Sequence, residues 1–153
     1  MQLLLLSETP EAIAQIAKWY SDEWGYIGAG RSTSELELKL ADYLNSDKLP
    51  LIIIAQEKNK LIGAAQLRFH EMDIYPDRDH WLGGVYVEAS SRGQGVAERL
   101  IGAIINKAKA LGVTSLNLQT EDKSGGLYTK LGWQAVEQVT YHGIKVLVME
   151  KSI

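Results

Sequence analysis

The chain has 153 residues, of which 46% are hydrophobic and 23% are charged, a balance typical of one globular domain with a single core. Its formal net charge is −3 and it has no run of basic residues, so nothing indicates a protein that binds nucleic acid or an anionic membrane surface. It contains no cysteine, which excludes disulfide bonds, thiolate zinc sites and a thiol nucleophile.

The apolar run at residues 3–6 does not match a secretory signal peptide. No charged segment precedes it, it is shorter than the roughly 7–15 residues of a signal-peptide core, and Pro10 follows soon after. No other apolar run approaches the roughly 20 residues of a membrane span. We therefore interpret residues 3–6 as a short buried strand and expect a cytoplasmic protein.

Two helices are predicted next. Thr9 and Pro10 form a helix start, with a capping hydroxyl followed by proline at the first helical position. Apolar residues then recur at helical spacing as far as Trp24, where a glycine-containing segment interrupts them. Ser32 and Glu35 match a capping box, which predicts the start of the second helix.

Three strands are expected after the second helix. Residues 51–56 and 61–69 are apolar runs separated by the polar sequence EKNK, which predicts a β-hairpin with a four-residue loop. A polar loop then leads to a strand at 81–87, where Gly83 and Gly84 indicate a bulge or a close backbone approach.

The clearest helix is predicted over residues 96–111, whose apolar side chains form one stripe, and Gly112 ends it. The strand–helix–strand stretch from 81 to 119 should be a right-handed parallel crossover. The full order is β-α-α-β-β-β-α-β-α-β-β, which indicates one α/β domain without repeats or linkers. The remaining predicted elements are a strand at 115–119, a short helix at 127–131, and strands at 133–139 and 145–150 that meet at a turn.

A glycine-rich turn, SSRGQGVA, joins the strand at 81–87 to the helix at 96–111. Gly93 and Gly95 let the backbone turn tightly and expose successive amide N–H groups. The helix N-terminus adds unpaired N–H donors and the positive end of its dipole, and Arg92 adds a positive charge. These features suit a phosphate or pyrophosphate, although a plain strand–helix connector could use the same residues.

Two common phosphate-binding motifs do not fit this turn. A Walker loop needs G-x-x-x-x-G-K-[ST], and no lysine–hydroxyl pair follows Gly95. A dinucleotide fingerprint needs G-x-G-x-x-G, and Glu98 stands where the third glycine would be.

Residues 85–100 resemble the acetyl-CoA signature of the GNAT superfamily of N-acetyltransferases. The core pattern of that signature is [RQ]-x-x-G-x-[GA], and Arg92, Gly95 and Ala97 occupy its three defined positions. Downstream, the sequence GGLYTKLGW resembles the second signature of the same family, although Leu127 stands where an aromatic residue is common.

The predicted order of elements is similar to that of this family over nearly the whole chain. The resemblance implies one N-acetyltransferase domain over residues 1–153, with a GNAT-like α/β fold. That fold has a mixed, mostly antiparallel central sheet of about seven strands and four helices. It also implies acetyl-CoA as co-substrate and an amine acceptor. No metal site is expected, because the three histidines lie far apart in sequence and form no H-x-x-x-H pair.

The resemblance further implies roles for individual residues. The glycine turn would hold the CoA pyrophosphate through backbone amides, and the strand before it would bind the pantetheine arm through its main chain, like an added strand. Tyr128 matches the tyrosine that protonates the departing CoA thiolate, as general acid. The implied cofactor-binding residues are Val85, Tyr86, Val87, Arg92, Gly93, Gln94, Gly95, Val96 and Ala97.

Without a cysteine, the simplest reaction is direct attack of an amine on the thioester. A lysine-like amine with a pKa of about 10.4 is neutral in only about one molecule in two thousand at pH 7, so it needs a base. Glu71 and Asp73 are the best-placed candidates, since their loop enters the strand that would carry the cofactor. Further base candidates are His70, His80 and Glu88.

Tyr26 and Arg31 are candidate acceptor-binding residues, because they lie between the first two helices, where this family builds its acceptor pocket. The acidic loop favours a small cationic amine, but a peptide amine stays open. A non-catalytic CoA- or acyl-CoA-binding sensor with the same fold is the alternative, and a partner-binding domain with an empty turn is a third. Dimers are common in families that this chain resembles, so a homodimer is also open.

Overall fold

The computed structural model describes residues 1–25 and 32–153, which contain seven strands, four α-helices and short 3₁₀ turns. The predicted order of elements is confirmed. The elements are β1 (Gln2–Leu5), α1 (Ile13–Trp24), α2 (Thr33–Leu40), β2 (Leu51–Glu57), β3 (Lys60–Phe69), β4 (His80–Val87), α3 (Val96–Ala110), β5 (Ser115–Thr120), α4 (Gly126–Lys130), β6 (Gln134–Tyr141) and β7 (Ile144–Ser152).

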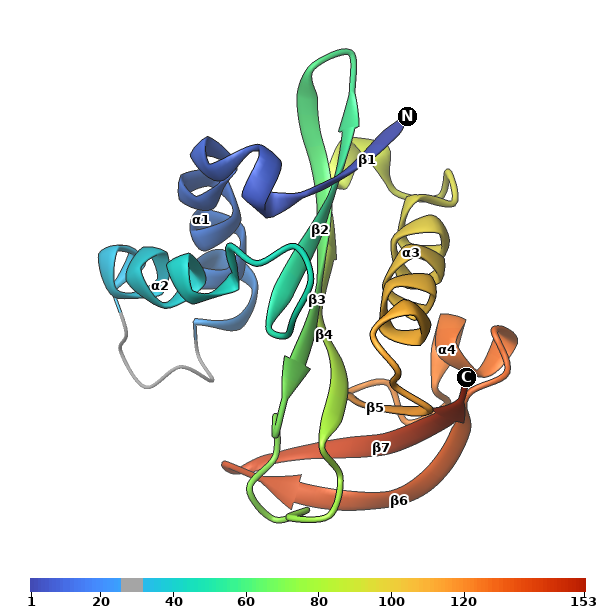
Figure 1. The fold of residues 1–153 in the computed structure, drawn as a ribbon. Coiled ribbons are helices and arrows are strands. Elements are labelled where there is room, and N and C mark those ends of the chain that lie inside the picture. The colour runs from blue at the N-terminus through green and yellow to red at the C-terminus, as the bar shows by residue number, and fades with distance from the viewer. Residues whose placement is uncertain (26–31) are drawn as a thin grey trace.

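All seven strands belong to one sheet, in the order β1-β2-β3-β4-β5-β7-β6. In the part of the chain that the structure describes, β4 and β5 are the one parallel pair, as expected for the crossover through α3, and the other pairs are antiparallel. Helices α1 and α2 cover one face of the sheet and α3 covers the other, while β6 and β7 run across the lower end of β3 and β4 (Figure 1).

Helix α3 forms as the apolar stripe predicts. Leu100, Ile101 and Ile104 are almost fully buried against the sheet, in the largest hydrophobic cluster of the described residues. At the C-terminal end, Gly112 takes a left-handed conformation with φ of 85°, and the Val113 amide donates to the Ala108 carbonyl at 2.9 Å. Glycine closes the helix here because it adopts positive φ without steric penalty.

The opposite face of the sheet is covered by α1, whose Ile16, Ala17 and Tyr20 are buried. The predicted capping role of Thr9 is wrong: its hydroxyl makes no capping hydrogen bond, and a 3₁₀ turn at Pro10–Ala12 precedes the helix. The predicted cap of α2 is confirmed, because Ser32 Oγ accepts a hydrogen bond of 3.1 Å from the Glu35 amide.

The hairpin between β2 and β3 is tighter than predicted. Its turn is Lys58 and Asn59 rather than the four residues EKNK, and both have positive φ, 51° and 65°. Such two-residue turns match the right-handed twist of the paired strands. The predicted turn between β6 and β7, at His142 and Gly143, is confirmed, and both residues again have positive φ, 49° and 80°.

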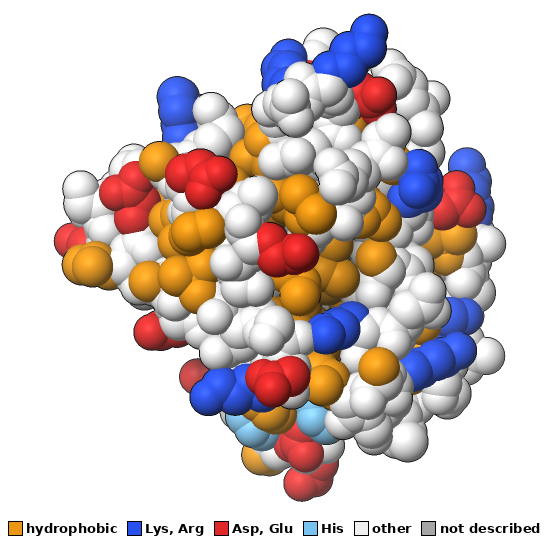
Figure 2. All heavy atoms as spheres, turned by 45° about the horizontal axis from the view of Figure 1, so that its top comes forward, with side chains coloured by type: hydrophobic (Ala, Val, Ile, Leu, Met, Phe, Trp, Pro, Cys, Tyr) orange, Lys and Arg blue, Asp and Glu red, His pale blue; other side chains and the backbone are white. Residues whose placement is uncertain are grey.

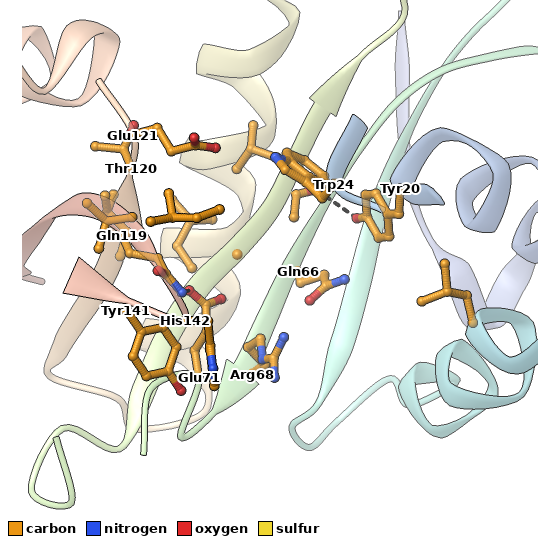
Figure 3. A pocket seen from close by; sticks show the side chains of 18 of the residues that line it. Tyr20, Trp24, Gln66, Arg68, Glu71, Gln119, Thr120, Glu121, Tyr141 and His142 are labelled. Atoms are coloured by element: carbon orange, nitrogen blue, oxygen red, sulfur yellow. Dashed lines mark hydrogen bonds between the residues drawn. The ribbon is translucent and has the colours of Figure 1, made fainter. Parts of the chain in front are cut away.

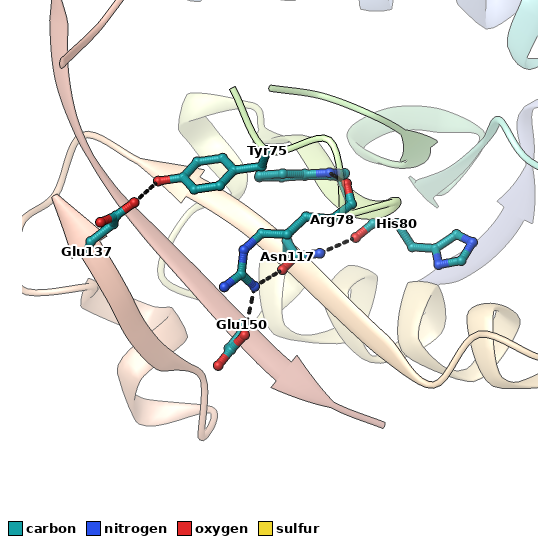
Figure 4. A network of polar contacts seen from close by, with 7 residues as sticks. Tyr75, Arg78, His80, Asn117, Glu137 and Glu150 are labelled. Carbon is teal, nitrogen blue, oxygen red and sulfur yellow. Dashed lines mark hydrogen bonds and ion pairs between the residues drawn. The ribbon is translucent and has the colours of Figure 1, made fainter. Parts of the chain in front are cut away.

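The loop between β3 and β4 packs against the sheet instead of extending into solvent. Met72 is fully buried there against Trp81, Val146 and Val148. Arg78 of the same loop donates hydrogen bonds of 2.7 Å to Asn117 Oδ1 and to Glu150 Oε2 (Figure 4). These contacts fix the loop over β5 and β7 and thereby set the position of the residues that precede Arg78.

The surface shows no continuous field of one charge in the view of Figure 2. Acidic and basic side chains are interspersed there, and hydrophobic side chains gather across the middle of that face. Among the described residues, no helix has both the length and the apolar character needed to cross a membrane.

Candidate active site

A cavity of about 580 Å³ lies on the sheet face that carries α1 and α2. These helices border one side of it, and the β3–β4 loop together with the β6–β7 hairpin borders the other (Figure 3). Residues of three neighbouring strands, β3, β4 and β5, complete the lining.

The cavity reaches the place where β4 and β5 separate. The two strands pair at Trp81 and Asn117 only, as far as the described residues show, whereas the other neighbouring strands pair over four or more positions. Asn117 is buried and donates a hydrogen bond of 3.0 Å to the His80 carbonyl, which holds the strands together at this point. After Trp81, the edge of β4 that faces β5 has main-chain N–H and C=O groups that β5 does not pair, and a ligand between the two strands could bind them.

A β-bulge bends β4 at the cavity, as its two glycines indicate. Gly84 and Val85 together stand opposite Ala65, because the register shifts by one residue there. The carbonyl of Gly84 accepts a hydrogen bond of 2.7 Å from the Tyr20 hydroxyl. A Cβ atom at Gly84 would lie 2.6 Å from that hydroxyl oxygen, and φ is 53°, so only glycine fits.

The glycine turn at the start of α3 faces open space. Gly93 and Gly95 have φ of 76° and 80°, and a Cβ atom built on either would meet nothing within 4 Å. Arg92 donates from Nε to the Val87 carbonyl at 2.8 Å, and its guanidinium lies 5.4 Å from the centre of the Tyr86 ring. The turn is thus fixed to the end of β4, and its unpaired amides at the helix N-terminus suit a pyrophosphate.

Tyr128 of α4 lines the cavity, and its ring packs edge-on against buried Trp133 with 6.1 Å between ring centres. Burial, with a further contribution from the negative charge of Glu71, raises the pKa of Tyr128 to about 12. The hydroxyl therefore keeps its proton at neutral pH and can act as a hydrogen-bond or proton donor.

Glu71 also lines the cavity, from the loop after β3. Its Oε2 accepts a hydrogen bond of 2.9 Å from Gln119 Nε2. Burial raises the pKa of Glu71 above its usual value, although the nearby Arg68 guanidinium and the Gln119 hydrogen bond oppose this effect. A carboxylate with a raised pKa is a better proton acceptor, and this is what a general base requires.

The other base candidates do not line the cavity. The exposed Asp73 carboxylate accepts a hydrogen bond of 3.1 Å from the Tyr141 hydroxyl. Glu88 accepts hydrogen bonds from Ser90 and Ser91 and pairs with a lysine, all of which lower its pKa. His70 Nδ1 lies 3.8 Å from Asp79 Oδ1, and both side chains are exposed. Tyr26 and Arg31, the predicted acceptor residues, lie outside the described residues.

Several polar side chains of the cavity were not predicted from the sequence, among them Tyr20, Gln66, Arg68 and Gln119. Gln66 and Arg68 interrupt the apolar strand β3 at alternate positions, so both point to one face. Two polar residues on the same face of an otherwise apolar strand could have indicated a polar cavity at this position.

The glycine pair before Tyr128 is explained by the chain itself. Gly125 and Gly126 have φ of 79° and 51°. A Cβ on Gly125 would collide with the Thr129 hydroxyl, and one on Gly126 would lie 2.7 Å from an Asp122 carboxylate oxygen. These contacts remove the need to invoke a close approach of the cofactor at this position. Among the described residues, no group of three or more His, Asp or Glu side chains could hold a metal ion.

The sequence and the fold both match known proteins. The family model described as "Acetyltransferase (GNAT) family" matches residues 13–133. A comparison with curated proteins by sequence found no match.

Several solved structures share the fold. Ribosomal-protein-alanine N-acetyltransferase from Brucella melitensis has a TM-score of 0.78 at 16% identity, with 100% of both chains covered. Aminoglycoside 6′-N-acetyltransferase complexed with coenzyme A has a TM-score of 0.77 at 16% identity, covering 99% of this chain and 97% of its own. The structure of yncA from Salmonella typhimurium with its cofactor acetyl-CoA has a TM-score of 0.75 at 16% identity, covering 99% of this chain and 92% of its own.

Proposed function

Because the chain belongs to the GNAT acetyltransferase family, we propose that it transfers an acetyl group from acetyl-CoA to a primary amine, by direct attack in a ternary complex. Two of the similar structures are named as acetyltransferases of a ribosomal-protein alanine and of an aminoglycoside, which supports an amine acceptor, a small cationic amine or a peptide amine. That residues 1–153 form a single N-acetyltransferase domain and that the protein is cytoplasmic stay predictions, and a homodimer stays open.

The residues present fit acetyl-CoA. Open space above Gly93 and Gly95 leaves room for a pyrophosphate on the amides of Gln94, Gly95 and Val96. The edge of β4 that β5 leaves unpaired, at Val85–Val87, offers main-chain donors and acceptors to the pantetheine arm. When bound, acetyl-CoA supplies an activated acetyl group and a thiol leaving group.

The observation that carries the proposal is that Glu71 and Tyr128 line one cavity beside the free edge of β4. Glu71 accepts a proton from the ammonium group of the acceptor and so frees the nitrogen lone pair. The nitrogen then forms a bond to the acetyl carbonyl carbon while the carbon–sulfur bond breaks.

Tyr128 donates its proton to the departing sulfur and is reprotonated with the second proton that the nitrogen loses. Glu71 passes the first proton to solvent, so that one proton is released for each amide formed. Both side chains thus return to their starting states after each turnover.

The sensor remains the alternative function, since a binding protein could use the same turn and the same strand edge. The test is amine-dependent release of CoA thiol from acetyl-CoA, measured over a panel of amino acids, polyamines, aminoglycosides and peptides. Release with one class supports the transferase. Stabilisation of the fold by acetyl-CoA without release for any amine would favour the sensor.

A further inference from the structure

Arg68 differs from Arg78 and Arg92, two arginines near the site, in its hydrogen bonding. Arg78 and Arg92 each donate hydrogen bonds to main-chain or side-chain oxygens. The Arg68 side chain lines the cavity, and its Nε is buried without a hydrogen-bond partner. Among the described residues, no carboxylate lies within ion-pair distance of its guanidinium. A buried guanidinium donor without an acceptor is costly, and a ligand that brings an acceptor would satisfy it.

Arg68 and Glu71 approach each other over a single glycine of β4. A Cβ atom on Gly83 would collide with Glu71 Oε1 and would lie 3.4 Å from Arg68 Cδ. Gly83 does not have positive φ, so the space above it, rather than its backbone conformation, requires glycine. Figure 3 shows the two side chains next to each other at the cavity. The cavity therefore presents one cationic and one anionic group side by side.

Among the described residues that line the cavity, acidic and basic side chains are equal in number. Glu71 and Glu121 are its acidic residues among the described lining, and Lys39 and Arg68 are its basic ones. A polyamine or an aminoglycoside would bring several positive charges to this balanced lining. An acceptor with one positive and one negative group matches the lining more closely.

We propose that the acceptor is a compact amino-carboxylate of the α-amino acid class, with its carboxylate on Arg68 and its amine at Glu71. The amine and the carboxylate of an α-amino acid are attached to the same carbon. This short separation suits Glu71 and Arg68, whose side chains both lie over Gly83. A guanidinium binds a carboxylate through two parallel hydrogen bonds. Gln66 Oε1, which is buried without a hydrogen-bond partner, adds an acceptor for the ammonium group.

This inference rests on the proposed function and narrows its acceptor from a cationic amine to a zwitterion. Arg68 acts on specificity: it holds the acceptor by a group that does not react. Its effect should therefore appear in the comparison of acceptors with and without a carboxylate, and only weakly in the binding of acetyl-CoA.

The experiment compares kcat/KM for each common amino acid with a primary α-amine with kcat/KM for its α-amide, by CoA thiol release. The amide keeps the amine and the side chain and removes only the carboxylate charge. The amine of the amide is also more often neutral, so simple reactivity would favour the amide. Arg68→Met removes the donors at similar length, and Arg68→Lys keeps the charge without the planar fork.

The expected result is a preference for at least one amino acid over its amide of roughly tenfold to a hundredfold, the usual size for a hydrogen-bonded charge pair. In Arg68→Met the ratio should fall close to one, with Arg68→Lys between the two. Thermal unfolding with and without acetyl-CoA checks that each variant folds and binds the cofactor.

Three results would overturn the inference. One is transfer to amides or simple amines with equal or better kcat/KM than to amino acids. Another is a preference for amino acids that survives Arg68→Met. In both cases the transferase stands and only the acceptor class is wrong. Absence of transfer to every amine tested would overturn the proposed function itself, and the inference with it.

Discussion

The Tyr20 hydroxyl donates a hydrogen bond of 2.7 Å to the carbonyl of Gly84, and this bond ties α1 to the bulge of β4. The bulge is the point at which β4 turns its free edge toward the cavity. Tyr20 is buried, and burial raises its pKa, so the hydroxyl keeps its proton at neutral pH and can donate this bond.

Tyr20→Phe should therefore destabilise the fold by about 1–3 kcal/mol, since it leaves a carbonyl acceptor without its partner. Tyr141→Phe is the matched control, because its hydroxyl contacts Asp73 at an exposed position, and it should cost about 0.5 kcal/mol or less. Urea unfolding measures both. If both variants lowered the free energy of unfolding by the same amount, the hydrogen bond to Gly84 would contribute no more stability than an exposed one.

Glu71→Gln should lower kcat/KM and remove the pH dependence of stability that Glu71 gives the wild type. The pKa of Glu71 is raised in the folded state, so its protonated form contributes stability that is fully present below its ordinary value of 4.5. That contribution is lost as the pH rises through the folded-state pKa. The variant does not lose it, so its Tm relative to the wild type should increase between pH 4 and pH 8.

Glu88→Gln provides the opposite case. The pKa of Glu88 is lowered, chiefly by hydrogen bonds from Ser90 and Ser91, so its charged form contributes stability above its ordinary pKa that is lost at low pH. This variant should fall below the wild type at neutral pH and approach it only as the pH drops below the ordinary value of 4.5 and through the lowered folded-state pKa. Thermal scans that give both variants the same slope with pH would contradict the environment assigned to Glu71.

Gly95→Ala should weaken acetyl-CoA binding beyond its effect on stability. Gly95 and Gly112 stand at the two ends of α3, with φ of 80° and 85°, and a Cβ on either meets nothing within 4 Å. Alanine at either position should therefore cost a similar amount, about 1–2 kcal/mol of backbone strain.

Only Gly95 belongs to the proposed pyrophosphate turn, so only its variant should raise the KM for acetyl-CoA, by tenfold or more. Initial-rate kinetics and urea unfolding on both variants separate the two effects. A similar rise in KM in Gly112→Ala would attribute the loss to general destabilisation of α3.

Tyr128→Phe tests the general acid. The variant should bind acetyl-CoA as well as the wild type, because the ring and its contact with Trp133 are kept. Its kcat should fall by roughly 10²- to 10⁴-fold, the usual contribution of a positioned proton donor. Stopped-flow or steady-state thiol release measures this, and an unchanged kcat would remove Tyr128 from the mechanism.

Local patterns predicted most of the fold. The stripe of α3, its end at Gly112 and the bulge at Gly84 are each indicated by a pattern within a short stretch of sequence, and all three were confirmed. The two errors also concern short segments. The residues around Thr9 are equally compatible with a capped helix and with the 3₁₀ turn that forms there. The sequence EKNK is equally compatible with a four-residue loop and with the two-residue turn at Lys58 and Asn59.

The site was predicted less completely, because it depends on which parts of the sheet stay uncovered. Arg68 and Gln66 are alternate residues of one strand, and only the arrangement of α1, α2 and the β3–β4 loop leaves them at a cavity. Gln119 meets Glu71 because β5 separates from β4, and no pattern within either segment encodes that separation.

The most direct test of the central claim is mass spectrometry of the amine acceptors after incubation with acetyl-CoA carrying a ¹³C-labelled acetyl group. We predict that the wild-type protein produces an acceptor heavier by one labelled acetyl group, in amounts equal to the CoA thiol released. An unlabelled acceptor pool, with acetyl-CoA bound but intact, would contradict an acetyltransferase.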